Sequence, residues 1–134
     1  MYLLDTNILS ELIKKQPNAH FLARLRSEQP QSLYTSAICV FELRFGSALR
    51  NDFITFWQKI TDDILSRITI LPFSGREALI AGDILAQLQK TGHKIGIEDI
   101  FIAATAIANR CTLVTANTRH YSHIPDLKIE NWIK

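Results

Sequence analysis

Residues 2–9 read Tyr-Leu-Leu-Asp-Thr-Asn-Ile-Leu, a short apolar run that meets an acid and then a helical pattern. The run Tyr2–Leu4 predicts a buried first strand. Thr6 or Asn7 is expected to cap a helix that carries Ile8 and Leu9. A buried strand followed at once by a helix is typical of an α/β domain.

The same alternation continues to the end of the chain. Further strands are predicted at residues 32–35, 67–71, 112–115 and 127–129. Helices are predicted from the caps Asn18, Ser36 and Ser74, and over residues 52–66 and 97–109, the last apolar nearly all round. We therefore expect one α/β domain, residues 1–134, with a central parallel sheet of about five strands covered by helices on both faces.

The composition excludes several classes of protein. The chain has 134 residues, of which 47% are hydrophobic and 21% charged, as in one globular domain. No apolar run approaches the ~20 residues of a membrane helix. The first residues lack the basic segment of a signal peptide, so we expect a soluble, cytoplasmic protein without a membrane partner. The net charge of +2 does not by itself indicate nucleic-acid binding.

The cysteines and histidines do not form a recognisable zinc motif. Cys39 and Cys111 lie in apolar segments, which favours two buried reduced thiols, although a disulfide remains open. His120 and His123 fall in a polar segment, and we interpret them as solvated loop residues.

Four oxygen-bearing side chains fall near predicted strand ends or on helices: Asp5, Glu42, Asp99 and Asn117. An open α/β sheet gathers such positions in the crevice outside the carboxyl ends of its strands. Carboxylates held together repel one another unless a hard cation such as Mg2+ joins them. The four residues therefore predict a metal site, while Asp5 alone would also suit an ordinary N-cap or turn.

Glu42 is the hardest of these residues to explain as structure. It lies between Ile38 and Phe45 in a helical stripe that continues to Leu49, and this stripe is predicted to face the core. A carboxylate there is costly unless it is paired or binds a metal. A buried ion pair is the alternative.

Asp99 and the Thr115–Asn117 segment have plain structural readings as well. A carboxylate in the first turn of a helix is favoured by the helix dipole, and the adjacent Glu98 would suit the same role. Asp99 is preferred because it shares a face with Ile102. Thr115 and Asn117 alone are ordinary turn residues, but after the fourth strand their oxygens would lie beside Asp5.

Four segments together resemble a PIN domain, and most of all the VapC toxins of bacterial toxin–antitoxin pairs. They are residues 3–7, residues 35–36 with 41–46, residues 95–104, and residues 114–119, and the likeness runs from about residue 2 to 131. The resemblance implies a Mg2+- or Mn2+-dependent endoribonuclease in which Asp5, Glu42 and Asp99 are catalytic and hold the ion. Thr6, Asn7, Thr115 and Asn117 would support this shell. The family often has Asp where this chain has Asn117, which favours one ion over two.

The resemblance also implies partners. The substrate would be a structured RNA, such as transfer or ribosomal RNA. A VapB-like antitoxin would insert its C-terminal segment into the acidic groove and supply an Arg or Lys. A homodimer or a higher toxin–antitoxin assembly is expected, with Leu12, Phe21 and Leu25 as a candidate dimer face; core packing is the alternative for these three side chains.

Other functions fit less well. A haloacid-dehalogenase-like phosphoaspartyl enzyme needs a second Asp where this chain has Asn7, and a receiver domain needs an Asp after the third strand, where Pro72 stands. A catalytically silent RNA-binding or interaction module with the same shell stays open. The charged Glu42 in an apolar stripe argues against that module.

Overall fold

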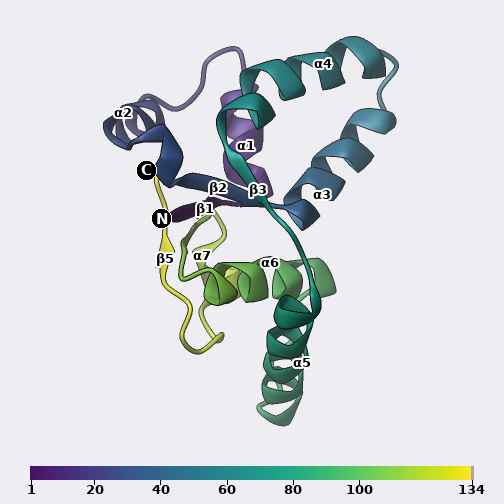
Figure 1. Cartoon of the computed structure of the whole chain (residues 1–134), viewed down its shortest axis with the longest axis vertical. Helices are drawn as coiled ribbons and strands as arrows, with labels where there is room; N and C mark the ends of the chain where they lie inside the picture. Colours follow the sequence, from purple (N-terminus) through teal and green to yellow (C-terminus); the bar gives the residue numbers. More distant parts are fainter. Residues whose placement is uncertain (134) are drawn as a thin grey trace.

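The computed structural model describes residues 1–133, and in it each of the first four strands is followed by one or two α-helices before the next strand begins (Figure 1). The strands are β1 (Tyr2–Leu4), β2 (Leu33–Ser36), β3 (Thr69–Leu71), β4 (Thr112–Val114) and β5 (Ile129–Glu130). The α-helices are α1 (Thr6–Leu12), α2 (Ala19–Ser27), α3 (Ala37–Ala48), α4 (Phe53–Asp63), α5 (Gly75–Lys90), α6 (Ile97–Ala108) and α7 (Thr118–Tyr121).

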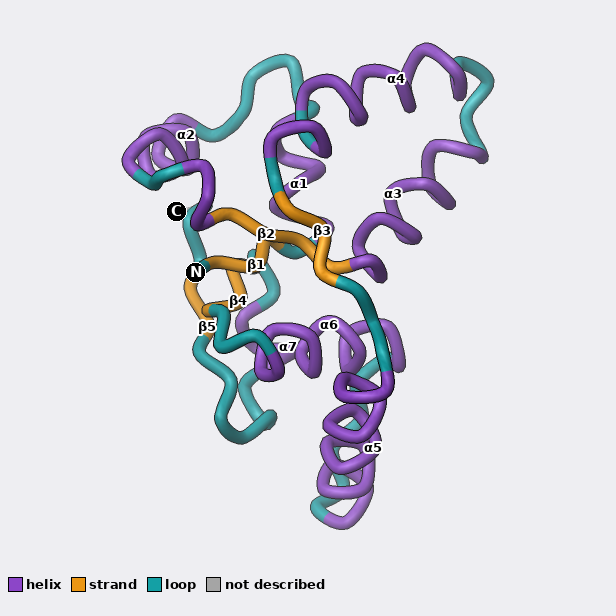
Figure 2. Tube along the Cα trace, in the orientation of Figure 1, coloured by secondary structure: helices purple, strands orange, loops and turns teal. Residues whose placement is uncertain are grey.

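The five strands form one parallel sheet in the order β3-β2-β1-β4-β5 (Figure 2). In the view of Figure 1, α1 to α4 lie above the sheet and α5 to α7 below it. This confirms the predicted single α/β domain with helices on both faces. The central strand β1 pairs with β2 and β4, so the carboxyl ends of these three strands lie side by side.

The core is apolar on both faces of the sheet, as a parallel sheet with two helical layers requires. The fully buried set includes Leu3 and Leu113 from the strands, Ile8 and Leu9 from α1, and Ile102 from α6. Residues 102–106 of α6 are all buried, which confirms the expected buried helix. Helices α1 and α6 are thus anchored by their buried side chains on opposite sides of the sheet, and β1, α1 and α6 carry or adjoin the predicted site residues.

Three predicted helix caps are confirmed. The side chain of Asn18 accepts a hydrogen bond from the Phe21 N–H at 2.9 Å and begins α2. Ser36 begins α3 in the same way, and Ser74 forms a capping box with Glu77 at the start of α5. Each cap satisfies backbone donors that the first turn of a helix leaves free.

Three details differ from the prediction. The N-cap of α1 is Asp5 and neither Thr6 nor Asn7, because the Asp5 carboxylate accepts the first free backbone N–H. Helix α4 ends at Asp63, since the chain tightens into a 3-10 turn at Leu65–Arg67 before β3. The fifth strand lies at Ile129–Glu130, where it pairs with β4, instead of at residues 127–129.

Other expectations are settled by burial. Cys39 and Cys111 are both free and buried, as predicted. Phe21 is completely buried in the core, so its placement in a homodimer face was wrong. Within residues 1–133, no helix combines the length and apolar character needed to cross a membrane.

Candidate active site

The predicted site residues meet at the carboxyl end of the central strands. Asp5 follows β1, Thr115 follows β4, Glu42 projects from the middle of α3, and Asp99 lies in the first turn of α6. A groove of about 460 Å³ is lined by Asp5, Thr6, Asn7, Ser10, Glu11, Lys14, Glu42, Asp99 and Asn117. The structure therefore brings six of the seven predicted residues to one groove, and Thr115 contacts it through Asp5.

Asp5 is the most buried carboxylate of the groove, with 4% of its surface exposed. It accepts hydrogen bonds from the Thr6 N–H at 2.8 Å, from the Thr115 hydroxyl at 2.9 Å and from the Tyr121 hydroxyl at 3.2 Å. Burial nevertheless raises the pKa of Asp5 above its ordinary value, and the nearby Asp99 adds to this. The charged form of Asp5 is thus disfavoured without a cation, despite three donors.

Glu42 is half-buried and is tied to the same helix end as Asp5. Its carboxylate accepts a hydrogen bond from the Thr6 hydroxyl at 2.6 Å. Burial raises the pKa of Glu42, and the negative charges of Asp5 and Asp99 raise it further. Thr6 therefore joins both carboxylates, through its N–H to Asp5 and through its hydroxyl to Glu42.

The apolar stripe around Glu42 does not face the core, contrary to the prediction. Phe45 and Leu49 are 61% and 73% exposed, and the buried face of α3 carries Cys39, Leu43 and Ser47. Helix α3 is apolar on two faces, and α1, α4 and the neighbouring strands β2 and β3 pack against the other one. Glu42 is therefore at the border between a covered and an open face, which lets its carboxylate reach the groove.

Asp99 is held by the short helix α7. One of its oxygens accepts a hydrogen bond from the Tyr121 hydroxyl at 3.1 Å, and the other lies 3.2 Å from His120 Nδ1. The interpretation of His120 as a solvated loop residue was incomplete, because its ring is partly exposed but touches Asp99 from α7. Asp99 lines the groove, as predicted, whereas the adjacent Glu98 is exposed and does not line it.

Thr115 connects the remaining supporting residues. Its hydroxyl oxygen accepts hydrogen bonds from the Asn117 N–H at 3.1 Å and from the Asn7 amide at 3.4 Å. The side-chain oxygen of Asn7 in turn accepts a hydrogen bond from the Ala116 N–H. The side chain of Asn117 is exposed and lines the groove. These contacts fix the turn after β4 against the start of α1, and so hold Thr115 against Asp5.

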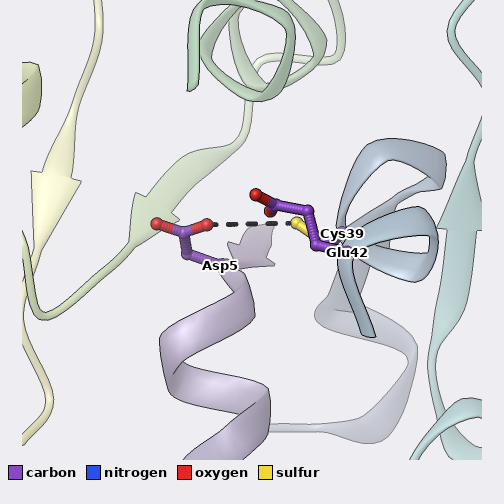
Figure 3. Close-up of side chains that lie close together, drawn as sticks. All are labelled: Asp5, Cys39 and Glu42. Carbon is purple, nitrogen blue, oxygen red and sulfur yellow. Dashed lines mark hydrogen bonds between the residues drawn. The ribbon is translucent and has the colours of Figure 1, made fainter. Parts of the chain in front are cut away.

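Besides His120, two residues that contact the predicted carboxylates were not predicted. Tyr121 is buried with its hydroxyl between Asp5 and Asp99. The sequence signal that could have indicated it is a large aromatic residue in a polar segment, because a buried tyrosine needs a hydrogen-bond partner for its hydroxyl. Cys39 has its sulfur 4.0 Å from Asp5 Oδ1. Figure 3 shows Cys39 and Glu42 projecting from α3 toward Asp5, and ligand atoms of these three residues all lie within 4.8 Å of one another.

The donors present fit a divalent cation. Among residues 1–133, no Lys, Arg or His nitrogen lies within 4.0 Å of the carboxylates of Asp5 or Glu42. Lys14, which lines the groove, is paired with Glu11. Neighbouring carboxylates with raised pKa and no cationic partner form a negative site, and carboxylate oxygens are the ligands of hard cations.

Comparison with known proteins agrees with this geometry. Residues 2–126 match the family model of the PIN domain. The chain belongs to the PIN-domain family. The parallel sheet with its acidic carboxyl edge is thus the PIN arrangement, and the resemblance seen in the four sequence segments is confirmed.

This PIN domain is similar along its whole length to proteins named as VapC ribonucleases. It is 34% identical to Ribonuclease VapC2 of Rickettsia felis, over 100% of this chain and 99% of that protein. It is 36% identical to Ribonuclease VapC2 of Haemophilus influenzae, over 98% of both chains. A tRNA(fMet)-specific endonuclease VapC of Salmonella typhimurium is 29% identical over 98% of this chain and 97% of its own.

Solved structures show the same fold. VapBC2 from Rickettsia felis bound to a DNA fragment from their promoter superposes with a TM-score of 0.88 at 33% identity, covering 98% of both chains. FitAcB from Neisseria gonorrhoeae gives a TM-score of 0.86 at 34% identity, covering 98% of this chain and 97% of that one. The domain is therefore a PIN domain of the VapC type.

Proposed function

We propose that this PIN domain is a divalent-metal-dependent endoribonuclease and the toxin of a VapBC-like toxin–antitoxin pair. The observation that carries the proposal is the group of Asp5, Glu42 and Asp99 in one groove, with the pKa of Asp5 and of Glu42 raised and no cationic side chain against either carboxylate. The relatives named as ribonucleases over the full length of the chain support the reaction class.

Asp5, Glu42 and Asp99 would hold Mg2+ or Mn2+. When bound, such an ion supplies an activated water and stabilises the charge that develops on the phosphate. Thr6 fixes the spacing of Asp5 and Glu42 through its two hydrogen bonds. Asn117 adds a neutral oxygen at the rim of the groove, where an acid would add charge, and this favours a single ion.

The substrate would be a structured RNA, and the bond cut a phosphodiester. A relative named as a tRNA(fMet)-specific endonuclease supports transfer RNA as the first substrate to test. Ribosomal RNA is the second. The turn after β4 borders the groove and leads into α7, whose Arg119 lies beside His120 along a further hollow of about 580 Å³. A phosphate backbone would thus meet the positive charge of Arg119 next to the acidic group.

The test is cleavage of total transfer RNA by the purified protein with Mg2+ or Mn2+, and with EDTA. We expect discrete fragments with metal, none with EDTA, and none from Asp99→Asn. The matched control is Asp83→Asn, which changes an exposed Asp on α5 and should cut as well as wild type. Metal-independent RNA binding without cleavage would instead favour the catalytically silent module.

A VapB-like antitoxin is the proposed partner, as the solved complexes of related chains support. An Arg or Lys of its C-terminal segment would bind Asp5, Glu42 and Asp99 and compete with the cation. A mainly apolar groove of about 440 Å³, which includes Leu12 and Leu25, would suit the apolar residues of such a segment. Inhibition of cleavage by the antitoxin, relieved by changing that Arg or Lys to Ala, would support this arrangement.

We also propose that the protein self-associates, through α3 and not through the face first expected at Leu12, Phe21 and Leu25. Phe41 and Phe45 of α3 and its C-cap residue Leu49 are exposed, and the two phenyl rings stack with centroids 6.4 Å apart. An exposed apolar stripe of this kind is typical of a protein–protein contact. Light scattering after size-exclusion chromatography should show a dimer for wild type and a monomer for Phe45→Arg.

A further inference from the structure

The Tyr121 hydroxyl lies between two of the proposed metal ligands. Its oxygen is 3.2 Å from Asp5 Oδ2 and 3.1 Å from Asp99 Oδ1, and the residue is 1% exposed. Asp5 follows β1 and Asp99 begins α6, so these carboxylates come from different layers of the domain. Tyr121 closes α7, which follows β4, and is the contact that connects the two.

The contacts divide the oxygens of Asp5 by role. Oδ2 accepts from the hydroxyls of both Thr115 and Tyr121. Oδ1 accepts from the Thr6 N–H and lies on the side of α3, 4.0 Å from the sulfur of Cys39. Because Oδ2 is held by two hydroxyls, Oδ1 is turned toward the side from which Glu42 enters the groove, as Figure 3 shows.

We propose that Tyr121 is a positioning residue of the metal site, which holds the Asp5 and Asp99 carboxylates at the separation and rotation that one cation requires. This inference rests on the proposed metal-dependent function. Groups that hydrogen-bond to metal ligands fix ligand orientation, and their removal typically weakens metal binding about 10- to 100-fold.

A purely structural role would not need the hydroxyl. The ring of Tyr121 is buried, and phenylalanine would fill the same space without a polar atom to satisfy. The hydroxyl has one proton, so at any moment it donates to only one of the two carboxylates, Asp5 or Asp99, and it can turn from one to the other. His120 contacts the second oxygen of Asp99, so α7 holds this carboxylate from two sides.

The test is Mn2+ binding measured by isothermal titration calorimetry for wild type, Tyr121→Phe and Tyr2→Phe. Tyr2 is the matched control, since its hydroxyl is also hydrogen-bonded, but to Arg24, which does not line the groove. We expect the dissociation constant for Mn2+ to rise about 10-fold or more in Tyr121→Phe and to stay unchanged in Tyr2→Phe. RNA cleavage by Tyr121→Phe should recover when Mn2+ is raised.

The outcomes separate the two levels of the hypothesis. If wild type binds no Mn2+, the proposed function fails. If wild type and Tyr121→Phe bind Mn2+ equally well, the positioning role fails while the function stands. The melting temperature in EDTA checks that Tyr121→Phe folds, and titrations are run well below it. A loss of cleavage that excess Mn2+ does not restore would overturn the positioning role in favour of a structural one.

Discussion

Replacing Asp5 by Asn should stabilise the metal-free protein while abolishing RNA cleavage. Asp5 is almost completely buried, and its pKa is raised although three donors contact it. The cost of burying this charge near Glu42 and Asp99 therefore exceeds what the hydrogen bonds return. Asparagine has the same shape, still accepts from the Thr6 N–H as the N-cap of α1, and carries no charge.

The size of the effect follows from the geometry. Burial is the main cause of the raised pKa of Asp5, and repulsion from Glu42, whose ligand atoms lie within 4.8 Å of those of Asp5, is a contribution whose size can be worked out. At that separation two unit charges repel by about 0.9 kcal/mol in water and by about 3.5 kcal/mol at an effective dielectric constant of ~20. The hydrogen bonds to the neutral side chain in Asp5→Asn are weaker than those to the charged carboxylate, which offsets about 1 kcal/mol or more of this gain. We expect a net gain of about 1 kcal/mol, which corresponds to about 3–4 °C in melting temperature for a domain of this length.

The gain should depend on pH. A carboxyl whose folded pKa is raised above its unfolded value of 3.8 destabilises the folded protein when it is charged, at pH above that raised pKa. As the pH falls toward 3.8, Asp5 becomes protonated in wild type and the penalty disappears. The difference in melting temperature between Asp5→Asn and wild type should therefore be largest near neutral pH and shrink on acidification.

The assay is thermal unfolding in EDTA from about pH 7.5 down to about pH 4.5, with cleavage of transfer RNA measured in parallel. Asp83→Asn on α5 controls for the change of residue type at an exposed position. If Asp5→Asn melts below wild type in EDTA, the hydrogen bonds to the charged carboxylate outweigh the cost of burying it, and the reasoning is refuted. Retained cleavage by Asp5→Asn would refute its assignment as a metal ligand.

Three further predictions concern other groups. Mn2+ binding to wild type should weaken as the pH falls, because protons compete with the ion at carboxyls whose pKa is raised. Glu42→Gln should bind Mn2+ more weakly and with a shallower pH dependence. An unchanged dependence of the Mn2+ affinity on pH, measured by calorimetry, would contradict this. Ser74→Ala should cost about 1 kcal/mol by removing the capping box. The Ser74 contacts lower the pKa of Glu77 from 4.5 to about 2, so this loss should be fully present above pH 4.5 and fade as the pH falls from 4.5 toward 2, as measured by urea unfolding. Burial raises the pKa of Cys39 and Cys111, so a thiol reagent should react slowly with both in the folded protein and fully in denaturant; a reaction of neither in denaturant would indicate a disulfide.

The sequence by itself determined the order of strands and helices and most of the acidic group. Tyr2–Leu4 ends at Asp5, and the buried helix α6 begins with an acid in its first turn, so both carboxylates were predictable from local patterns. Parallel pairing then brings the ends of β1 and β4 together. These features depend on periodicity within a short segment, and that periodicity is readable without a partner.

Only the tertiary structure decided which face of an element is covered. Helix α3 has apolar residues on two faces, and the sequence pattern selected the one that is exposed, with Phe45 and Leu49. Phe21 was offered as a surface residue and lies in the core. Tyr121 gained its role from Asp5 and Asp99, which are distant in sequence. The physical reason is that an apolar stripe shows only that a face can be buried; the neighbours that cover it, and the groups that a buried hydroxyl meets, follow from the packing of all layers together.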